Sequence, residues 1–201
     1  MPKLTLVQGS GENVAGLLKA AGQLFRKKGF AATTVREIAD LAGVWPGSLH
    51  YHFPTKESIL LALMERGIET AEAGFREAVA KSDDPIARLR LAMKAHIRML
   101  VGDDDGTYVL LYEGRGLEDE ARAAMVRLRD RYDAMWEGLL YQAVGTGRLK
   151  PDLDLKLVRL SILGSLNWVA QWFSTEGGRS ADEVGEHFAE TLLGGLLTTS
   201  A

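Results

Sequence analysis

Apolar residues recur at helical spacing along almost the whole chain. The first segment of this kind has its apolar residues on one helical face: Val14, Leu17, Leu18, Ala21, Leu24 and Phe25. Lys27 and Lys28 close this segment and Gly29 follows it, as is typical of a helix C-terminus. No segment alternates apolar and polar residues in the manner of a half-buried strand. The pattern therefore predicts an all-α fold.

The next helices are short, and the sequence marks their ends. Thr34 to Glu37 reads T-x-x-E, a capping box that opens a second helix, and Gly43 ends that helix. A third helix over residues 46–53 must stop before Pro54, because proline lacks the amide hydrogen that continues a helix. Thr55 is placed to cap a long fourth helix.

The remaining helices are expected between breaks that are rich in Gly and Asp. They are predicted over residues 85–101, 107–115, 118–145, 154–174 and 181–198. Ser180 and Glu183 form a second capping box before the last of them. We expect residues 103–105, three aspartates in a row, to form a solvated turn, and residues 1–10 to be loose.

The stretch VWPGSLHYHF, residues 44–53, gathers aromatic rings around one Gly and one Ser. On a helical wheel of about 100° per residue, Leu49 and Phe53 share the inner face. The outer face then carries small, hydroxyl and ring side chains: Gly47, Ser48, His50 and Tyr51. Such a face is a poor core and a good hydrogen-bonding surface. His50 and His52 lie about 200° apart on a helix and cannot bind one metal ion, so no metal and no cofactor is expected.

Two short helices joined by a glycine turn have two interpretations. They can form a helix-turn-helix, whose second helix enters the DNA major groove, or a plain αα corner in a helical protein. The spacing alone does not separate the two. Charge favours the first, because residues 1–60 hold seven Lys or Arg against four Asp or Glu, whereas the rest holds 17 against 23. A basic head on an acidic body indicates that only the head meets a polyanion.

The run GFAATTVREIADLAGVWPGSLHYHFPTKESIL, residues 29–60, resembles the DNA-binding domain of TetR-family transcriptional repressors. The resemblance implies a three-helix helix-turn-helix head over residues 11–57 and a helical ligand-binding and dimerisation body over 58–201. It also implies a set of contacts to double-stranded operator DNA: Thr34, Arg36, Trp45, Pro46, Gly47, Ser48, His50, Tyr51, His52 and Lys56. His52 and Lys56 of this set would contact phosphates.

Two positions depart from the family pattern. Trp45 stands where the family has Ser or Thr, so the side-chain cap of the third helix is missing, although Pro46 presets φ at its first position. His50 stands where the family has Tyr. Trp45 has two interpretations, a partly buried ring beside the first helix, or a ring laid on a sugar-phosphate edge or a thymine methyl.

The predicted helix 154–174 is apolar nearly all round between residues 157 and 173, so it needs a second partner besides its own domain. The last helix offers a similar surface. In the resembling family the last two helices form a four-helix dimer interface, which implies a homodimer. The interface candidates are Gly164, Ser165, Trp172, Phe188, Leu192 and Leu196.

Polar and aromatic side chains on otherwise apolar faces are candidates for an effector pocket. With their apolar neighbours they are Met64, Ile68, Met93, His96, Ile97, Leu100, Tyr108, Tyr112, Arg115, Asn167, Trp168 and Gln171. Each of them could equally be a satisfied core or interface residue. The pattern leaves open which of Asn167, Trp168, Gln171 and Trp172 face a pocket and which face the dimer interface.

Residues 108–197 resemble, more loosely, the TetR branch that responds to acyl-CoA thioesters. Arg98, Arg115 and Arg122 are then the basic groups available for CoA phosphates. The alternatives are an apolar or aromatic effector oriented by His96, Asn167 or Gln171, or no effector. The chain has no cysteine, no Gly-rich phosphate loop, no nucleophile elbow, no signal-peptide pattern and no long uninterrupted apolar run. We therefore expect a cytoplasmic repressor that a small hydrophobic effector releases from DNA, with no membrane partner and no enzyme activity.

Overall fold

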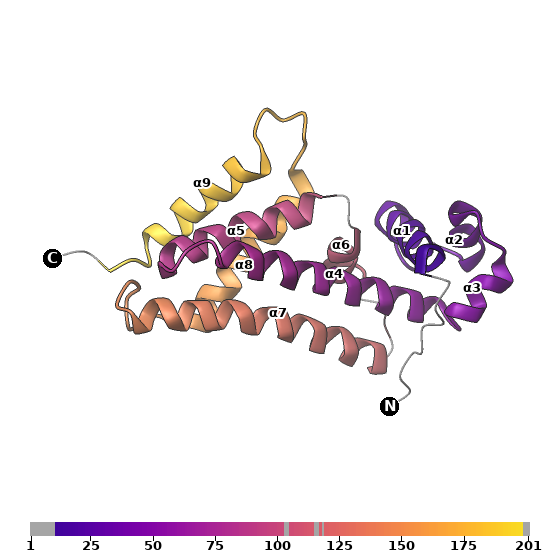
Figure 1. Ribbon diagram of the computed structural model, residues 1–201, viewed down its shortest axis with the longest axis horizontal. Helices are drawn as coiled ribbons and strands as arrows, with labels where there is room; N and C mark the ends of the chain where they lie inside the picture. Colours follow the sequence, from indigo (N-terminus) through magenta and orange to yellow (C-terminus); the bar gives the residue numbers. More distant parts are fainter. Residues whose placement is uncertain (1–10, 103–104, 115–116, 118, 199–201) are drawn as a thin grey trace. The chain divides into compact units, whose positions relative to one another are not determined.

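The computed structural model describes residues 11–102, 105–114, 117 and 119–198 of the chain (Figure 1). In chain order its helices are α1 (Gly11–Lys28), α2 (Val35–Ala42), α3 (Pro46–His52), α4 (Lys56–Val79), α5 (Pro85–Val101), α6 (Asp105–Tyr112), α7 (Asp119–Gly145), α8 (Leu155–Trp172) and α9 (Ala181–Gly194). The described residues hold no strand beyond one antiparallel bridge, between Leu149 and Leu197. The all-α prediction is confirmed.

Two predicted helix ends are wrong, each for a tertiary reason. Asp105 opens α6 instead of lying in a solvated turn, because its carboxylate pairs with Arg26 at 3.0 Å; residues 103 and 104 lie outside the described part. The last helix stops at Gly194 rather than at residue 198. Beyond it the backbone pairs with the segment before α8, where Lys150 donates to the Leu196 carbonyl at 3.0 Å.

The chain forms two compact units. The first contains the described residues up to Gly67 together with those from 105 to Met125, so it joins α1–α3 and the start of α4 to α6 and the start of α7. Inside it α4 and α6 touch backbone to backbone at Gly67. A Cβ at that position would lie 2.5 Å from the Gly106 carbonyl carbon, so only glycine permits the contact.

The second unit contains the described residues from 68 to 102 and from 126 to 198. Its central helix is α5, which contacts both α8 and α9, and Figure 1 shows α9 running beside it. A Cβ at Gly185 would lie 2.9 Å from Lys94 Cγ, so this glycine lets α9 approach α5 closely. Ion pairs close the edge of the same contact, Lys94 with Glu186 at 2.9 Å and Arg98 with Asp182.

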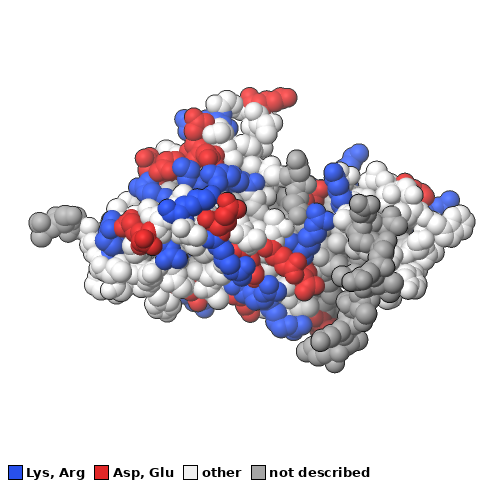
Figure 2. Space-filling view, viewed as in Figure 1, with Lys and Arg blue, Asp and Glu red and all other residues white. Residues whose placement is uncertain are grey.

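Charge is mixed rather than segregated on the one face that Figure 2 shows. Figure 2 shows Lys and Arg side chains interspersed with Asp and Glu on the face in view. Within the described residues, no helix has the length and apolar character needed to cross a membrane. Nor does that part of the chain bring together three His, Cys, Asp or Glu side chains that could hold a metal ion.

Candidate nucleic-acid interface and ligand site

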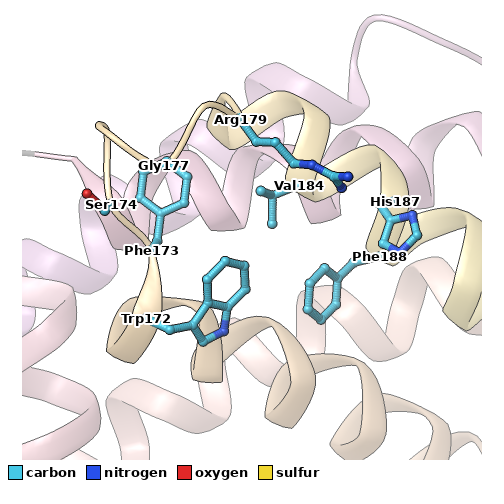
Figure 3. Close-up of a pocket in the computed structure, with 8 residues that line it drawn as sticks. All are labelled: Trp172, Phe173, Ser174, Gly177, Arg179, Val184, His187 and Phe188. Atoms are coloured by element: carbon cyan, nitrogen blue, oxygen red, sulfur yellow. The ribbon is translucent and has the colours of Figure 1, made fainter.

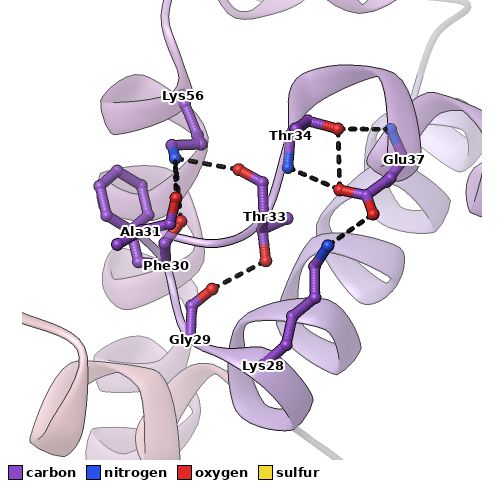
Figure 4. A network of polar contacts seen from close by, with 8 residues as sticks. All are labelled: Lys28, Gly29, Phe30, Ala31, Thr33, Thr34, Glu37 and Lys56. Carbon is purple, nitrogen blue, oxygen red and sulfur yellow. Dashed lines mark hydrogen bonds and ion pairs between the residues drawn. The ribbon is translucent and has the colours of Figure 1, made fainter.

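A reciprocal cap fixes the start of α2 (Figure 4). Thr34 Oγ1 accepts a hydrogen bond from the Glu37 amide at 3.3 Å, and the Glu37 carboxylate accepts one from the Thr34 amide at 2.9 Å. Lys28, at the end of α1, pairs with the same carboxylate at 2.5 Å. The hydrogen bond from Lys28, and then that from the Thr34 amide, lowers the pKa of Glu37 to about 2. The predicted capping box is confirmed, and it also ties α2 to α1.

A left-handed glycine turns the chain from α2 into α3. Gly43 has φ +69°, a conformation that is costly for any residue with a Cβ. Val44 donates to the Ala39 carbonyl at 3.0 Å across this turn, and α3 begins at Pro46 two residues later. Two short helices joined in this way form a helix-turn-helix.

The faces of α3 agree with the helical wheel. Leu49 and Phe53 are buried in the core of the first unit. Gly47, Ser48 and His50 are exposed, and His52 is half-buried. Tyr51 is 72% exposed, and the ring nearest to it is that of His52, at 5.3 Å. On α2, the Arg36 side chain is 85% exposed and approaches Asp40 only to 4.0 Å.

Trp45 is exposed, so the interpretation of a partly buried ring beside the first helix is wrong. As the N-cap residue of α3 it makes no side-chain capping bond, and 79% of its surface is open. Together with Arg36, Pro46 and His50 it lines an open groove between α2 and α3. Pro46 at the first helical position presets φ, and the Ser48 amide donates to the Trp45 carbonyl at 2.9 Å at this end of α3.

Helix α6 is fastened to α1 by contacts that the sequence did not predict. The Phe30 amide, just after α1, donates to the Glu113 carboxylate at 2.7 Å. Arg26 pairs with Asp105 and stacks over the ring of Tyr108, 4.7 Å from its centroid. No periodic pattern marks Glu113, since its partner lies 83 positions away. The helix that carries Tyr108 therefore belongs to the same unit as the helix-turn-helix.

A polar and aromatic cluster is buried in the second unit. His96 Nδ1 lies 3.0 Å from the Tyr132 hydroxyl, and Nε2 lies 2.9 Å from Asn167 Oδ1. One neutral tautomer satisfies both contacts, with Nε2 donating to the amide oxygen and Nδ1 accepting from the phenol. Burial lowers the pKa of His96 to about 4. Tyr132 and Trp136 were missed at the sequence level, although they form an i, i+4 aromatic pair on α7.

An open cavity of about 370 Å³ lies where α8 passes into α9 (Figure 3). Its lining residues are Trp172, Phe173, Ser174, Gly177, Arg179, Val184, His187 and Phe188. Figure 3 shows the Arg179 guanidinium reaching toward His187, above a floor of rings and Val184. The cavity thus combines apolar walls with two nitrogen-bearing side chains at one rim. The sequence predicted Trp172 and Phe188 for the dimer interface and did not predict a cavity here.

One face of α8 is apolar and uncovered in the single chain. Leu157, Leu160, Trp168 and Trp172 are 59%, 49%, 64% and 48% exposed. Gly164, also exposed, falls in the same stripe, and a Cβ there would meet nothing within 4 Å. Of the other interface candidates, Ser165, Phe188, Leu192 and Leu196 are half-buried.

Comparison with known proteins decides the family. Residues 17–63 match the model of bacterial regulatory proteins of the tetR family, and residues 82–196 match the tetracyclin repressor-like C-terminal domain. The chain belongs to the TetR family. TetR-family members with these two domains are transcriptional regulators, so the chain is a regulator and not an enzyme, as the sequence predicted.

Relatives of this TetR-family regulator match it over most of its length. The HTH-type transcriptional repressor KstR2 of Mycobacterium tuberculosis (strain ATCC 25618 / H37Rv) is 30% identical over 182 residues, 90% of each chain. The solved structure of the ketosteroid transcriptional regulator KstR2 of Mycobacterium tuberculosis matches with a TM-score of 0.81 at 27% identity, covering 96% of this chain and 97% of that one. AibR in complex with isovaleryl coenzyme A and operator DNA matches with a TM-score of 0.78 at 27% identity, covering 92% and 98%.

Lys56 of this TetR-family chain is engaged inside the head, although the sequence assigned it to a DNA phosphate. Its ammonium group donates to the carbonyls of Phe30 and Thr33 at 2.9 Å and of Ala31 at 3.3 Å (Figure 4). It also lies 4.4 Å from the centre of the Phe30 ring. An ammonium group has three donors, and these carbonyls match all three.

Replacing Lys56 by Met is therefore expected to lower the free energy of unfolding by about 1–2 kcal/mol, because three carbonyls lose a charged donor. Chemical denaturation of the purified chain measures this loss. The salt dependence of DNA binding should stay as it is in the wild type. A flatter salt slope with unchanged stability would instead show that Lys56 contacts a phosphate.

None of the predicted effector residues that the structure describes lines the cavity between α8 and α9. These residues are divided between the two units. Those in the first unit are Met64, Tyr108 and Tyr112. Those with apolar side chains that are buried in the second unit are Ile68, Met93, Ile97 and Leu100. Trp168 and Gln171 are exposed on α8. Trp168 follows Asn167 by about 100° around the helix, so it faces away from the cluster that holds Asn167. Arg98 is held by Asp182, through two hydrogen bonds, so it is not free for a CoA phosphate. Arg115 lies outside the described residues.

The buried His96 predicts a pH dependence of stability. Its pKa of about 4 in the folded chain lies below the usual value near 6.5, so between these values the unfolded chain binds a proton that the folded chain does not. The free energy of unfolding should then fall as the pH falls through this window, by about 2 kcal/mol from pH 7 to pH 5. Urea titrations at the two pH values measure the change.

His96→Gln is expected to reduce that pH-dependent loss by the same amount, since glutamine keeps polar contacts and does not titrate. His187→Gln, which removes an exposed histidine from α9, is the matched control and should behave as the wild type. An equal pH dependence in all three chains would exclude the buried imidazole as its source.

Proposed function

We propose that this TetR-family regulator binds a palindromic operator as a homodimer and that an acyl-CoA thioester releases it. The exposed face of α3 is the observation that carries the proposal. It presents Ser48, His50 and Tyr51 to solvent on a helix whose opposite side, at Leu49, is fully buried. A short, rigidly seated helix with a polar outer face fits the major groove, where donors and acceptors on base edges are read.

The proposed DNA contacts fall into two groups, contacts to base edges and contacts to the DNA backbone. Ser48, His50 and Tyr51 are assigned to base edges in the groove, with Pro46 and Gly47 allowing close approach. Thr34 and Arg36 at the start of α2, and His52 at the end of α3, are assigned to the DNA backbone. Arg36 supports this assignment, because its guanidinium is exposed and its ion pair with Asp40 is long, at 4.0 Å. Phosphate contacts fix the register and base contacts select the sequence.

The homodimer would form through α8 and α9. The exposed stripe of Leu157, Leu160, Trp168 and Trp172 supports it, since rings and leucines that alternate with Gly164 leave an apolar surface without cover. A seven-residue recognition helix reads few base pairs, and a two-fold dimer doubles the site. The two heads would meet successive major grooves about 34–36 Å apart.

The identity of the effector is a separate part of the proposal. AibR, a relative by fold and sequence, was solved with isovaleryl coenzyme A and operator DNA. In this chain Met93 and Ile97 are fully buried in the second unit near the His96 and Asn167 pair, so an acyl group would have to open a space among them and compete for the hydrogen bond of that pair. Arg122 belongs to the first unit, where its guanidinium donates to the Leu117 carbonyl at 3.4 Å, so no arginine is assigned to the CoA phosphates. Release requires that the ligand prefer a conformation whose heads no longer fit the operator.

The cavity between α8 and α9 favours a second candidate effector, a small aromatic or aliphatic acid. Its walls are the rings of Trp172, Phe173 and Phe188, and Arg179 at the rim is placed for a carboxylate. Its volume of about 370 Å³ suits a small molecule rather than a whole coenzyme.

One screen separates the two candidates. An operator is first selected from random DNA, and its release is followed by fluorescence anisotropy with acyl-CoAs, their free acids and CoA alone. Release by acyl-CoAs only, retained in Arg179→Gln, supports the thioester. Release by free acids that Arg179→Gln abolishes supports the cavity and overturns the thioester. Operator binding that none of these compounds changes would overturn both.

A further inference from the structure

Trp45 occupies the leading end of α3, the end that enters the groove first in the proposed complex. At 79% it is among the most exposed large apolar side chains of the described residues. An indole exposed to water does not stabilise the free chain, and the ring caps no amide of the helix. The side chain is therefore available to a partner at a position where the helix would meet DNA.

The ring has a defined orientation. A Cβ built on Gly47 would lie 3.0 Å from Cδ1 and 3.1 Å from Nε1 of Trp45, so the pyrrole edge of the indole faces the first turn of α3. The opposite edge of an indole is the six-membered ring, which contains only carbon. Glycine at position 47 leaves room for this arrangement, and a Cβ there would shift the ring by a few tenths of an ångström. The helix thus presents a hydrocarbon edge rather than the indole N–H.

The groove beside the ring has an apolar part as well as the polar side chains of Arg36, Asp40 and His50. Pro46 follows Trp45 and has no amide hydrogen to offer, and Val35, Ala39 and Val44 line the same groove between α2 and α3. A serine or threonine at position 45 would have offered a hydroxyl, but here the leading end of the helix offers carbon. A hydrocarbon edge cannot donate a hydrogen bond to a phosphate, so displacing the water around a phosphate would not strengthen DNA binding.

The major groove has one apolar feature on its base edges, the C5-methyl group of thymine. We propose, on the basis of the DNA-binding function proposed above, that Trp45 reads a thymine through this methyl group in each half of the operator. The contact distinguishes thymine from cytosine, adenine and guanine by burying the methyl group against the six-membered ring. It is a specificity contact additional to the polar contacts of Ser48, His50 and Tyr51.

The test compares three full-length chains in selections from random duplex DNA. The wild type should select one thymine per half-site that Trp45→Ser does not select, while the remaining positions stay the same. Trp45→Ser supplies the hydroxyl cap that α3 lacks, so it is expected to fold, and thermal unfolding checks this. Tyr141→Ser, which removes another exposed ring, from α7, is the matched control and should select the wild-type site.

Replacing the selected thymine by deoxyuridine then removes the methyl group alone. Wild-type affinity should fall roughly fourfold for one half-site and about tenfold or more for both, as expected for burial of one methyl group each. The affinity of Trp45→Ser should not change. Equal wild-type affinity for thymine and deoxyuridine, or a loss of affinity in Trp45→Ser that is the same for all sequences, overturns the thymine contact. A wild type that selects no sequence overturns the DNA-binding proposal itself, which is a different result.

Discussion

Replacing Tyr51 by Ala is expected to abolish specific operator binding, with a loss of about 100-fold or more in affinity. The phenol stands on the outer face of α3, and its nearest ring neighbour is His52, so its removal takes away a groove contact in each of two half-sites. A base-edge contact is worth about 1–3 kcal/mol, and a dimer loses it twice. Fluorescence anisotropy with the selected operator measures the loss.

The fold should survive this change, because Tyr51 is 72% exposed and contributes little to the core. Circular dichroism and sedimentation of Tyr51→Ala should match those of the wild type. Tyr51→Phe separates the hydroxyl from the ring, and Tyr141→Ala on α7 should bind normally. Wild-type operator affinity in Tyr51→Ala would mean that α3 is not the recognition helix.

Replacing Gly164 by Glu is expected to turn the proposed dimer into a monomer. A side chain at this position meets nothing within 4 Å in the single chain, so the folded monomer accommodates it. In the dimer it would place a carboxylate among Leu160, Trp168 and their symmetry mates. Burying an unpaired charge costs several kcal/mol, which corresponds to a dissociation constant about 1,000-fold higher or more. Sedimentation velocity at micromolar concentration measures the outcome.

The matched control is Gly138→Glu. Gly138 is likewise an exposed helical glycine with open space around its Cβ, but it lies on α7. The helix-propensity change is the same for both variants, so a difference between them reports the interface alone. If Gly164→Glu sediments as the wild type does, the exposed stripe of α8 is not the dimer contact.

Local sequence rules predicted the head well because its determinants are close together along the chain. The bond between Thr34 and Glu37 spans three residues, and the helical wheel that buries Leu49 needs only the period of the helix. The left-handed turn at Gly43 is similarly local. Such features depend on backbone geometry, which repeats from one protein to the next.

The same rules failed where a side chain is claimed by a distant partner. Arg98 was assigned to a phosphate, yet Asp182, 84 positions away, holds it. Lys56 was assigned to DNA, yet it bridges carbonyls more than 20 positions back. Helix α8 looked apolar all round, and only the arrangement of its neighbours shows that Asn167 turns inward while Trp168 stays in solvent. Periodicity identifies an apolar face but not which element covers it.

The glycine contact between α4 and α6 limits how a sensor could be engineered from this scaffold. A library that randomises Tyr108 and Tyr112, two of the predicted effector residues, would change the helix that makes this contact. Gly67 must be held constant in such a library, since even alanine would collide with the backbone at Gly106 and Thr107. Substitutions at Gly67 are therefore expected to destabilise the first unit, whatever they do to the choice of ligand.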